Sequence, residues 1–181
     1  RTSQNSSQWD NIKGSALFFR GSTFLKLLWL FSKAYDKSTA TSDLGIALRL
    51  TSDYNVPSER ANVEKSYDQT LSDLKQSIDY FPLSVYNPLR PSKLAAYGYI
   101  ARTYLSMREY DSAYIYADKC LRQDSVLIDY NNQVQVNLEN SYPFQDFNKE
   151  IVHEEYDNRF VIYSIIGSYA SMDTTLYQSY E

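Results

Sequence analysis

Residues Ser92–Leu121 constrain the fold of this chain more than any other segment. They read SKLAAYGYIARTYLSMREYDSAYIYADKCL and predict two amphipathic helices joined by a turn of about three residues. Small side chains let two antiparallel helices approach closely, and aromatic rings fill the groove between them. The segment therefore predicts a tightly packed helix pair. Its expected core comprises Tyr97, Ile100, Ala101, Tyr104, Ala113, Ala117, Cys120 and Leu121.

This pattern is typical of a tetratricopeptide (TPR) helix pair, whose repeat is about 34 residues long. Ser92 is the expected N-cap of a helix over 94–107, and a second helix is expected over 110–123. An earlier pair is also predicted. Its first helix runs from Ser7 to Lys33, and its second starts near the N-cap Asn62 and stops before Pro82. The apolar stripe expected to face the core of the first helix is Ile12, Ala16, Phe19, Thr23, Leu27 and Leu30.

The rest of the sequence predicts long loops and a carboxyl-terminal region without the helical pattern. Residues 35–61 form a long connection inserted between the helices of the first pair, with a short extended piece at 45–50. Beyond Asp124 the helical periodicity weakens, and 150–153 and 159–166 are the candidates for short strands. We therefore expect an all-α fold of TPR-like antiparallel helix pairs with a short β-like tail. Residues 1–125 would form the helical scaffold and 126–181 an irregular, partly β segment, within one structural domain.

Composition excludes several classes of protein. The 18 basic and 22 acidic residues give a net charge of −4. This argues against a nucleic-acid-binding protein, which would carry a stripe of basic residues. The longest apolar run, Phe24–Phe31, is far shorter than the roughly 18 to 20 residues that span a bilayer, and we expect it to be a buried helix.

The sequence shows no constellation of residues that predicts catalysis. His153 is the only histidine and has no cysteine cluster beside it, so a zinc site of the usual composition is not expected. A G-x-S-x-G elbow and a glycine-rich phosphate loop are both missing. The single cysteine, Cys120, occupies a small-residue position on an apolar helix face, where a buried structural thiol is expected. We therefore expect no enzyme activity, no metal and no cofactor.

Tyrosine is over-represented, with 18 copies, and most fall at helical core spacing. Four of them fall outside the helical stripes and are the weak candidates for ligand binding: Tyr54, Tyr86, Tyr130 and Tyr142. Exposed aromatic faces can stack on sugars or hold peptide side chains, although local packing against loop backbone is the favoured interpretation.

Several blocks, in order, resemble the SusD/RagB family, the surface nutrient-binding lipoproteins of Bacteroidetes outer membranes. The blocks are WDNIKGSALFFR at 9–20, SDLGIALRL at 42–50, PSERA at 57–61 leading into YDQTLSDL at 67–74, RPSKLAAY at 90–97 continuing to Leu121, and, more weakly, DTTLY at 173–177. The combination is more specific than a TPR pattern alone.

The resemblance implies a SusD-like fold and a role in binding rather than catalysis. Proteins of this family lie on a TonB-dependent (SusC-like) transporter at the extracellular face of the outer membrane and capture oligosaccharides or, in some members, peptides. They are held by a lipid on an amino-terminal cysteine, an anchor that this chain lacks, and we expect the chain to be an internal fragment. No ligand-binding residue of the family carries over to a position in this sequence. The alternative from the residues alone is a TPR-type protein–protein interaction module without a nutrient role.

Overall fold

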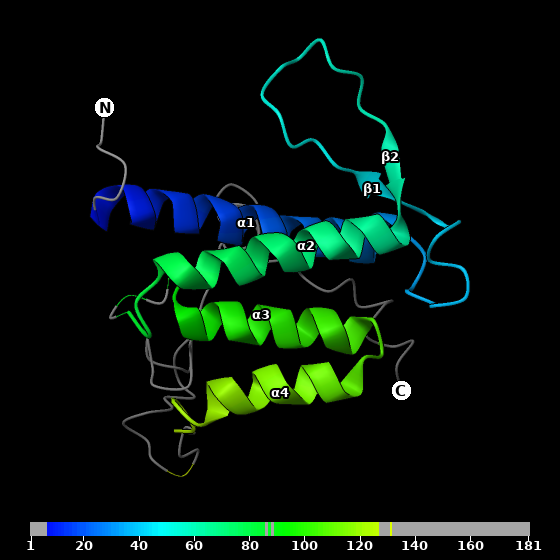
Figure 1. The fold of residues 1–181 in the computed structure, drawn as a ribbon. Helices are drawn as coiled ribbons and strands as arrows, with labels where there is room; N and C mark the ends of the chain where they lie inside the picture. Colours follow the sequence, from blue (N-terminus) through cyan, green and yellow to red (C-terminus); the bar gives the residue numbers. More distant parts are fainter. Residues whose placement is uncertain (1–6, 86, 88, 127–130, 132–181) are drawn as a thin grey trace, which may run out of the picture.

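The computed structural model describes residues 7–85, 87, 89–126 and 131. Within them the chain forms four α-helices, which confirms the expected all-α class (Figure 1). The helices are α1 (Ser7–Phe31), α2 (Val63–Ser77), α3 (Lys93–Ser106) and α4 (Tyr110–Leu121), with a 3-10 turn η1 (Ile78–Tyr80) after α2. Two short strands, β1 (Leu44–Ala47) and β2 (Arg60–Asn62), lie in the connection between α1 and α2.

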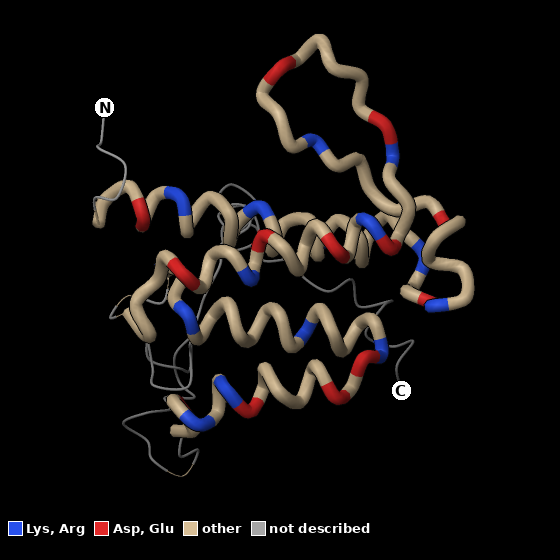
Figure 2. The backbone as a smooth tube through the Cα atoms, in the orientation of Figure 1, with Lys and Arg blue, Asp and Glu red and all other residues tan. Residues whose placement is uncertain are grey.

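The helices lie side by side in chain order, and each runs antiparallel to the one before it (Figure 1). The α1–α2 and α3–α4 pairs are the two helix pairs expected from the sequence, and α2 packs on α3 to join them. None of the helices within the described ranges is long and apolar enough to cross a membrane. Acidic and basic residues are interspersed along α1, α2 and α4, so these helices carry surfaces of mixed charge (Figure 2).

Both expected N-caps form. The Asn62 side chain accepts a hydrogen bond of 2.8 Å from Lys65 N, and the Ser92 hydroxyl accepts one of 3.2 Å from Ala95 N. Each bond satisfies a backbone N–H that the first turn of a helix leaves without a partner inside the helix. The starts of α2 and α3 are therefore fixed by local sequence.

The connection between α1 and α2 is tied to the helices at its base. β1 and β2 pair antiparallel, with Leu44 opposite Asn62 and Ala47 opposite Arg60. The Arg60 guanidinium donates hydrogen bonds to the carbonyl oxygens of Gly45 (2.8 Å) and Phe31 (3.0 Å). Residues 48–59 then project away from the helices as a loop (Figure 1). The sequence predicted the extended piece around β1, but its pairing with β2 was not expected.

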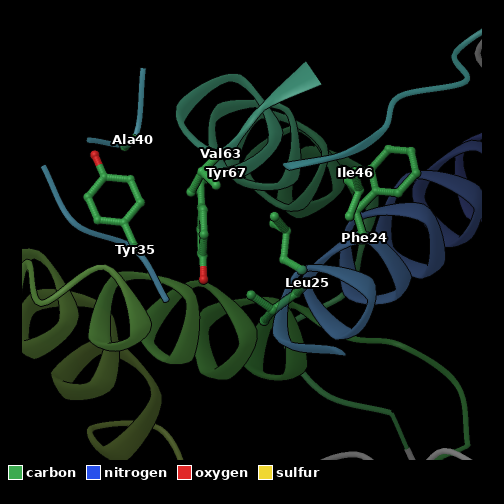
Figure 3. Close-up of a cluster of buried hydrophobic side chains, with 8 residues drawn as sticks. Phe24, Leu25, Tyr35, Ala40, Ile46, Val63 and Tyr67 are labelled. Atoms are coloured by element: carbon green, nitrogen blue, oxygen red, sulfur yellow. The ribbon is translucent and has the colours of Figure 1, made fainter. Parts of the chain in front are cut away.

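Two apolar clusters form the core. The first joins the carboxyl-terminal half of α1 to the connection and the start of α2, where the rings of Tyr35 and Tyr67 meet edge to face at 5.2 Å (Figure 3). The second lies between α1, α2 and α3 and consists of Phe18, Leu71, Leu74, Phe81, Ala95, Ala96 and Ile100. Together the clusters hold α1, α2 and α3 as one layer of helices.

The stripe predicted for α1 is wrong in phase. Ile12 and Leu30 are 63% and 74% exposed, and Ala16, Phe19 and Thr23 are exposed as well. Only Leu27 of the predicted stripe packs against the core, where it is half-buried. The buried face is instead Gly14, Phe18, Gly21, Ser22, Phe24, Leu25 and Leu28. A Cβ on Gly21 would lie 2.9 Å from Leu74 Cγ, so α1 approaches α2 closely at a residue that has no side chain. Apolar periodicity alone does not reveal that choice.

The predicted burial of the run Phe24–Phe31 holds for three of its residues and is wrong for the last three. Phe24, Leu25 and Leu28 are buried, whereas Trp29, Leu30 and Phe31 are 43%, 74% and 66% exposed. At 100° per residue, an eight-residue apolar run covers the whole circumference of a helix. One neighbouring layer can therefore bury only part of it.

The expected core of the α3–α4 pair is partly correct. Ile100 and Ala113 are buried, and five of the other six expected residues are half-buried: Tyr97, Ala101, Tyr104, Ala117 and Cys120. The assignment of Leu121 is wrong, because its side chain is 61% exposed. Cys120 points at α3, with its Sγ 3.7 Å from Leu94 O. Leu121 follows it in the helix and is therefore rotated by 100° away from the face that contacts α3. The candidate strands at 150–153 and 159–166 lie outside the described residues, and the division at residue 125 stays a prediction.

Candidate functional site

The four candidate tyrosines do not form a site within the described residues. Tyr54 lies in the projecting loop and is 84% exposed. Tyr86, Tyr130 and Tyr142 lie outside the described residues, as does His153. The described ranges also hold no group of three or more His, Cys, Asp or Glu side chains that could bind a metal ion.

A pocket of about 370 Å³ lies at one end of the helical layer. The amino-terminal end of α1, the end of α2 and the start of α3 lie at this same end of the layer (Figure 1). Its polar lining comes from the first turns of α1 and from the loop before α3: Ser7, Asp10, Asn11 and Arg90. Its apolar lining comes from η1 and the following loop: Tyr80, Pro82, Val85 and Pro91.

An aromatic and cationic cluster holds the Tyr80 wall of the pocket in place. The Tyr80 ring meets the Trp9 ring edge to face, with centroids 6.1 Å apart. Lys13 Nζ lies 4.7 Å from the Trp9 centroid and 4.8 Å from the Tyr80 centroid. A cation over the faces of two rings is attracted by both of their quadrupoles. Tyr80 is therefore fixed to α1 by two neighbouring side chains.

Gly14 allows η1 to approach α1 this closely. A Cβ at position 14 would lie 2.8 Å from Tyr80 Cβ and 2.9 Å from Phe81 Cε1, closer than side chains tolerate. Phe81 is buried and meets Phe18 of α1 edge to face at 6.1 Å. Gly14 and the buried Phe81 together place Tyr80 beside the first turns of α1.

The loop that carries Arg90 is closed on itself. Lys93 N donates to Pro82 O (3.0 Å) and Leu94 N donates to Leu83 O (3.2 Å), which joins the two ends of the loop. Within it, Asn87 Oδ1 accepts from Leu89 N, and Asn87 O accepts from Arg90 N, both at 2.9 Å. An asparagine side chain that bonds the backbone two residues on stabilises a tight turn. Arg90 therefore extends from an ordered turn.

Two charged side chains of the pocket are not used by the fold. Within the described part of the chain, neither the Asp10 carboxylate nor the Arg90 guanidinium has a hydrogen-bond or ion-pair partner. This differs from Asp73 elsewhere in the layer, which is fully buried and receives two bonds of 2.6 Å from Arg20. The Asp73 carboxylate and desolvation act on Arg20 in opposite directions, and the hydrogen bond prevails, so the pKa of Arg20 is raised.

Sequence reasoning missed this pocket. Its polar residues are separated by up to 83 positions, from Ser7 to Arg90, and they match no short motif. The nearest signals were the block that begins at Trp9 and the dipeptide Arg90-Pro91, which marked the family resemblance without marking a site. Only the folded layer brings these residues together.

Comparisons with known proteins place the fold. A SusD-like family model, described as "Starch-binding associating with outer membrane", matches residues 1–105. The crystal structure of a SusD superfamily protein from Bacteroides thetaiotaomicron VPI-5482 is similar, with 25% identity and a TM-score of 0.61 over 76% of this chain. A SusD-like carbohydrate binding protein from Bacteroides vulgatus ATCC 8482 shares 19% identity, with a TM-score of 0.64 over 75% of this chain. No curated protein matches the sequence.

This chain spans 28% and 29% of the length of those two structures. The family model covers more than half of the chain, including α1, the connection, α2 and nearly all of α3. The chain therefore belongs to the SusD-like family.

Proposed function

We propose that the protein captures an oligosaccharide at the cell surface and delivers it to a TonB-dependent transporter of the outer membrane. The observation that carries this proposal is the family match over residues 1–105, whose description names both starch binding and the outer membrane. The solved relative described as a carbohydrate binding protein supports the same ligand class through its fold. The protein would act without catalysis and would be held at the extracellular face of the membrane by a lipid anchor.

The pocket at the amino-terminal end of α1, here called the α1 pocket, supports this proposal through its chemistry. Sugars are recognised by side chains that exchange hydrogen bonds with hydroxyl groups and by apolar or aromatic surfaces that cover C–H groups. Asp10, Asn11 and Arg90 provide the first kind of contact, and Tyr80 provides the second. The pocket volume of about 370 Å³ falls in the range of small-ligand sites, roughly 300 to 1,000 Å³.

Delivery is tested by uptake. Deletion of the gene in the source organism is expected to slow uptake of the labelled oligosaccharide that the full-length protein binds, because capture would no longer concentrate it at the transporter. Restoring the gene should restore the rate. Unchanged uptake after deletion, at oligosaccharide concentrations that limit growth, would contradict a role in delivery.

A second candidate is a protein–protein interaction module of the TPR type. It is favoured by the outer face of α4, where Tyr110, Tyr114 and Ile115 are 64%, 71% and 50% exposed. Exposed aromatic and aliphatic side chains in one place are typical of a surface that another protein covers. This candidate predicts binding to peptides or proteins and none to sugars. A single binding screen against both kinds of ligand therefore distinguishes the two functions.

A further inference from the structure

We propose that the α1 pocket binds the uncharged terminal sugar residue of an oligosaccharide, with Asp10 accepting and Arg90 donating hydrogen bonds to its hydroxyl groups. This inference rests on the proposed function and adds to it the location of a subsite, the charge of its ligand and the part of the glycan it takes.

The charge of the pocket argues for an uncharged ligand. Among the described residues, its lining holds one carboxylate and one guanidinium, and their formal charges cancel. Because these two groups do not pair with each other, each can bond to a ligand. A uronic acid would place its carboxylate in the same pocket as Asp10, and an amino sugar would place its ammonium beside Arg90, so either ligand loses at one group what it gains at the other.

Hydroxyl groups match both of these side chains. A hydroxyl donates one hydrogen bond and accepts others, whereas an ionised carboxylate only accepts and a guanidinium only donates. Neighbouring hydroxyls of one sugar ring can therefore satisfy Asp10 and Arg90 at once. Hydrogen bonds to ionised groups are stronger than those between neutral groups, which makes these two residues the expected main determinants of affinity.

The opposite wall suits the C–H face of a sugar ring. Tyr80, Pro82 and Val85 present ring and aliphatic surface to the pocket. Tyr80 is held by Trp9 and Lys13, and the Arg90 loop is closed by backbone hydrogen bonds. Both walls are therefore set before a ligand arrives, which reduces the entropy lost on binding.

The size of the pocket argues for the end of a glycan. A volume of about 370 Å³ lies near the lower limit of small-ligand sites, so it accepts one or two sugar residues instead of a longer stretch of chain. The lining comes from three segments: the first turns of α1, the region of Tyr80–Val85, and Arg90-Pro91. The end of a glycan chain fills a site of this size, whereas a longer stretch of chain would extend beyond it.

The test compares two probes made of the same sugar, maltoheptaose and β-cyclodextrin. Both hold seven glucose residues, but the ring has no terminal residue. The full-length protein and its Asp10→Asn and Arg90→Gln variants are titrated with each probe by calorimetry. We expect each variant to bind maltoheptaose about tenfold or more weakly than the wild type, since each loses hydrogen bonds to an ionised group. The affinity of each variant for β-cyclodextrin should equal that of the wild type.

Matched controls separate the pocket from a general effect of charge. Glu59→Gln and Lys65→Gln make the same changes of charge at exposed positions outside the pocket, and both should bind maltoheptaose as the wild type does. Thermal unfolding of all five proteins should show that each is folded at the titration temperature. Tyr80→Leu is a further variant, which removes the aromatic wall while keeping an apolar side chain. It should weaken the binding of maltoheptaose and leave the binding of β-cyclodextrin unchanged.

The outcomes are distinct. Wild-type affinity for maltoheptaose in both pocket variants would overturn the pocket as a glycan site while leaving the proposed function standing. Equal weakening for the linear and the cyclic probe would overturn recognition of a chain end. Tighter binding of an oligogalacturonide than of maltoheptaose by the wild type, with the difference lost in Arg90→Gln, would overturn the uncharged ligand. A wild-type protein that binds no oligosaccharide at all would overturn the proposed function and this inference with it.

Discussion

At the scale of single residues, the most demanding feature of the described fold is the buried carboxylate of Asp73. Its side chain has no exposed surface, and a charge without solvent is costly unless it is paired and hydrogen-bonded. Arg20 supplies two bonds of 2.6 Å from Nε and Nη2, and Gln69 Nε2 supplies a third of 2.8 Å. This set of bonds joins α1 to α2 at the centre of the layer.

Replacing Arg20 with Met is expected to lower the free energy of unfolding by about 3 kcal/mol, because it leaves Asp73 buried and without its cation. Denaturant titration of the full-length protein measures the change. The double variant Arg20→Met with Asp73→Leu should recover most of the loss, because an apolar pair of similar volume avoids the buried charge. A single variant as stable as the wild type would show that the pair does not hold the helices together.

Cys120 is expected to react slowly with thiol reagents. Burial, and to a smaller extent the nearby charge of Asp124, raises the pKa of its thiol, so a smaller fraction is thiolate at any given pH than for a free cysteine. In the folded full-length protein, alkylation at Cys120 should be at least about tenfold slower at pH 8 than in the unfolded protein, and its rate should keep rising above pH 8.5. Peptide mapping by mass spectrometry measures both rates. Equal rates in the two states would contradict the placement of Cys120 against α3.

At the scale of helices and strands, glycine positions decide how α1 meets its neighbours. Gly21 and Gly98 both lie inside helices, yet a Cβ on Gly21 would lie 2.9 Å from Leu74 Cγ, whereas one on Gly98 would meet nothing within 4 Å. Gly21→Ala should destabilise the protein by about 1 to 3 kcal/mol through overpacking. Gly98→Ala is the matched control and should stabilise it by up to about 1 kcal/mol through helix propensity.

Denaturant titration of both variants gives the comparison directly. Stabilisation by Gly21→Ala equal to that by Gly98→Ala would mean that α1 and α2 are not in the close contact described here.

Helix ends could be predicted from the sequence because their causes are local. Asn62 and Ser92 act as caps within three residues of the N–H groups they bond, and a single pass along the chain detects them. The orientation of α1 could not be predicted in the same way. Ile12 and Leu30 fit an apolar stripe as well as Phe18 and Leu28 do, and the choice between the two faces depends on small residues that meet α2.

The pocket was beyond sequence reasoning for a related reason. Asp10 is a common kind of residue in the first turn of a helix, because its negative charge interacts favourably with the helix dipole. Arg90 is likewise an ordinary exposed cation in a loop. They line one pocket because Gly14 lets η1 lie close to α1 and because the loop that carries Arg90 is closed by backbone hydrogen bonds. Both the approach of η1 and the closed loop result from tertiary packing. The sequence around Asp10 does not indicate that Arg90 lies near it, and the sequence around Arg90 does not indicate Asp10.

At the scale of the whole molecule, the described residues form a scaffold with a small site at one end. Two antiparallel helix pairs pack in one layer, and the chain belongs to a family described as starch-binding and associating with the outer membrane. The chain spans little more than a quarter of the matched structures, so the layer is one part of the binding protein that we propose.

The most direct test of this account is a binding screen of the full-length protein against immobilised oligosaccharides and peptides side by side, followed by chromatography of each bound ligand. We predict binding to one or more neutral oligosaccharides, none to the peptides, and recovery of each sugar at its original length. Binding to peptides alone would instead support the interaction module. Shortened sugars would show an enzyme and contradict a protein that captures its ligand without changing it.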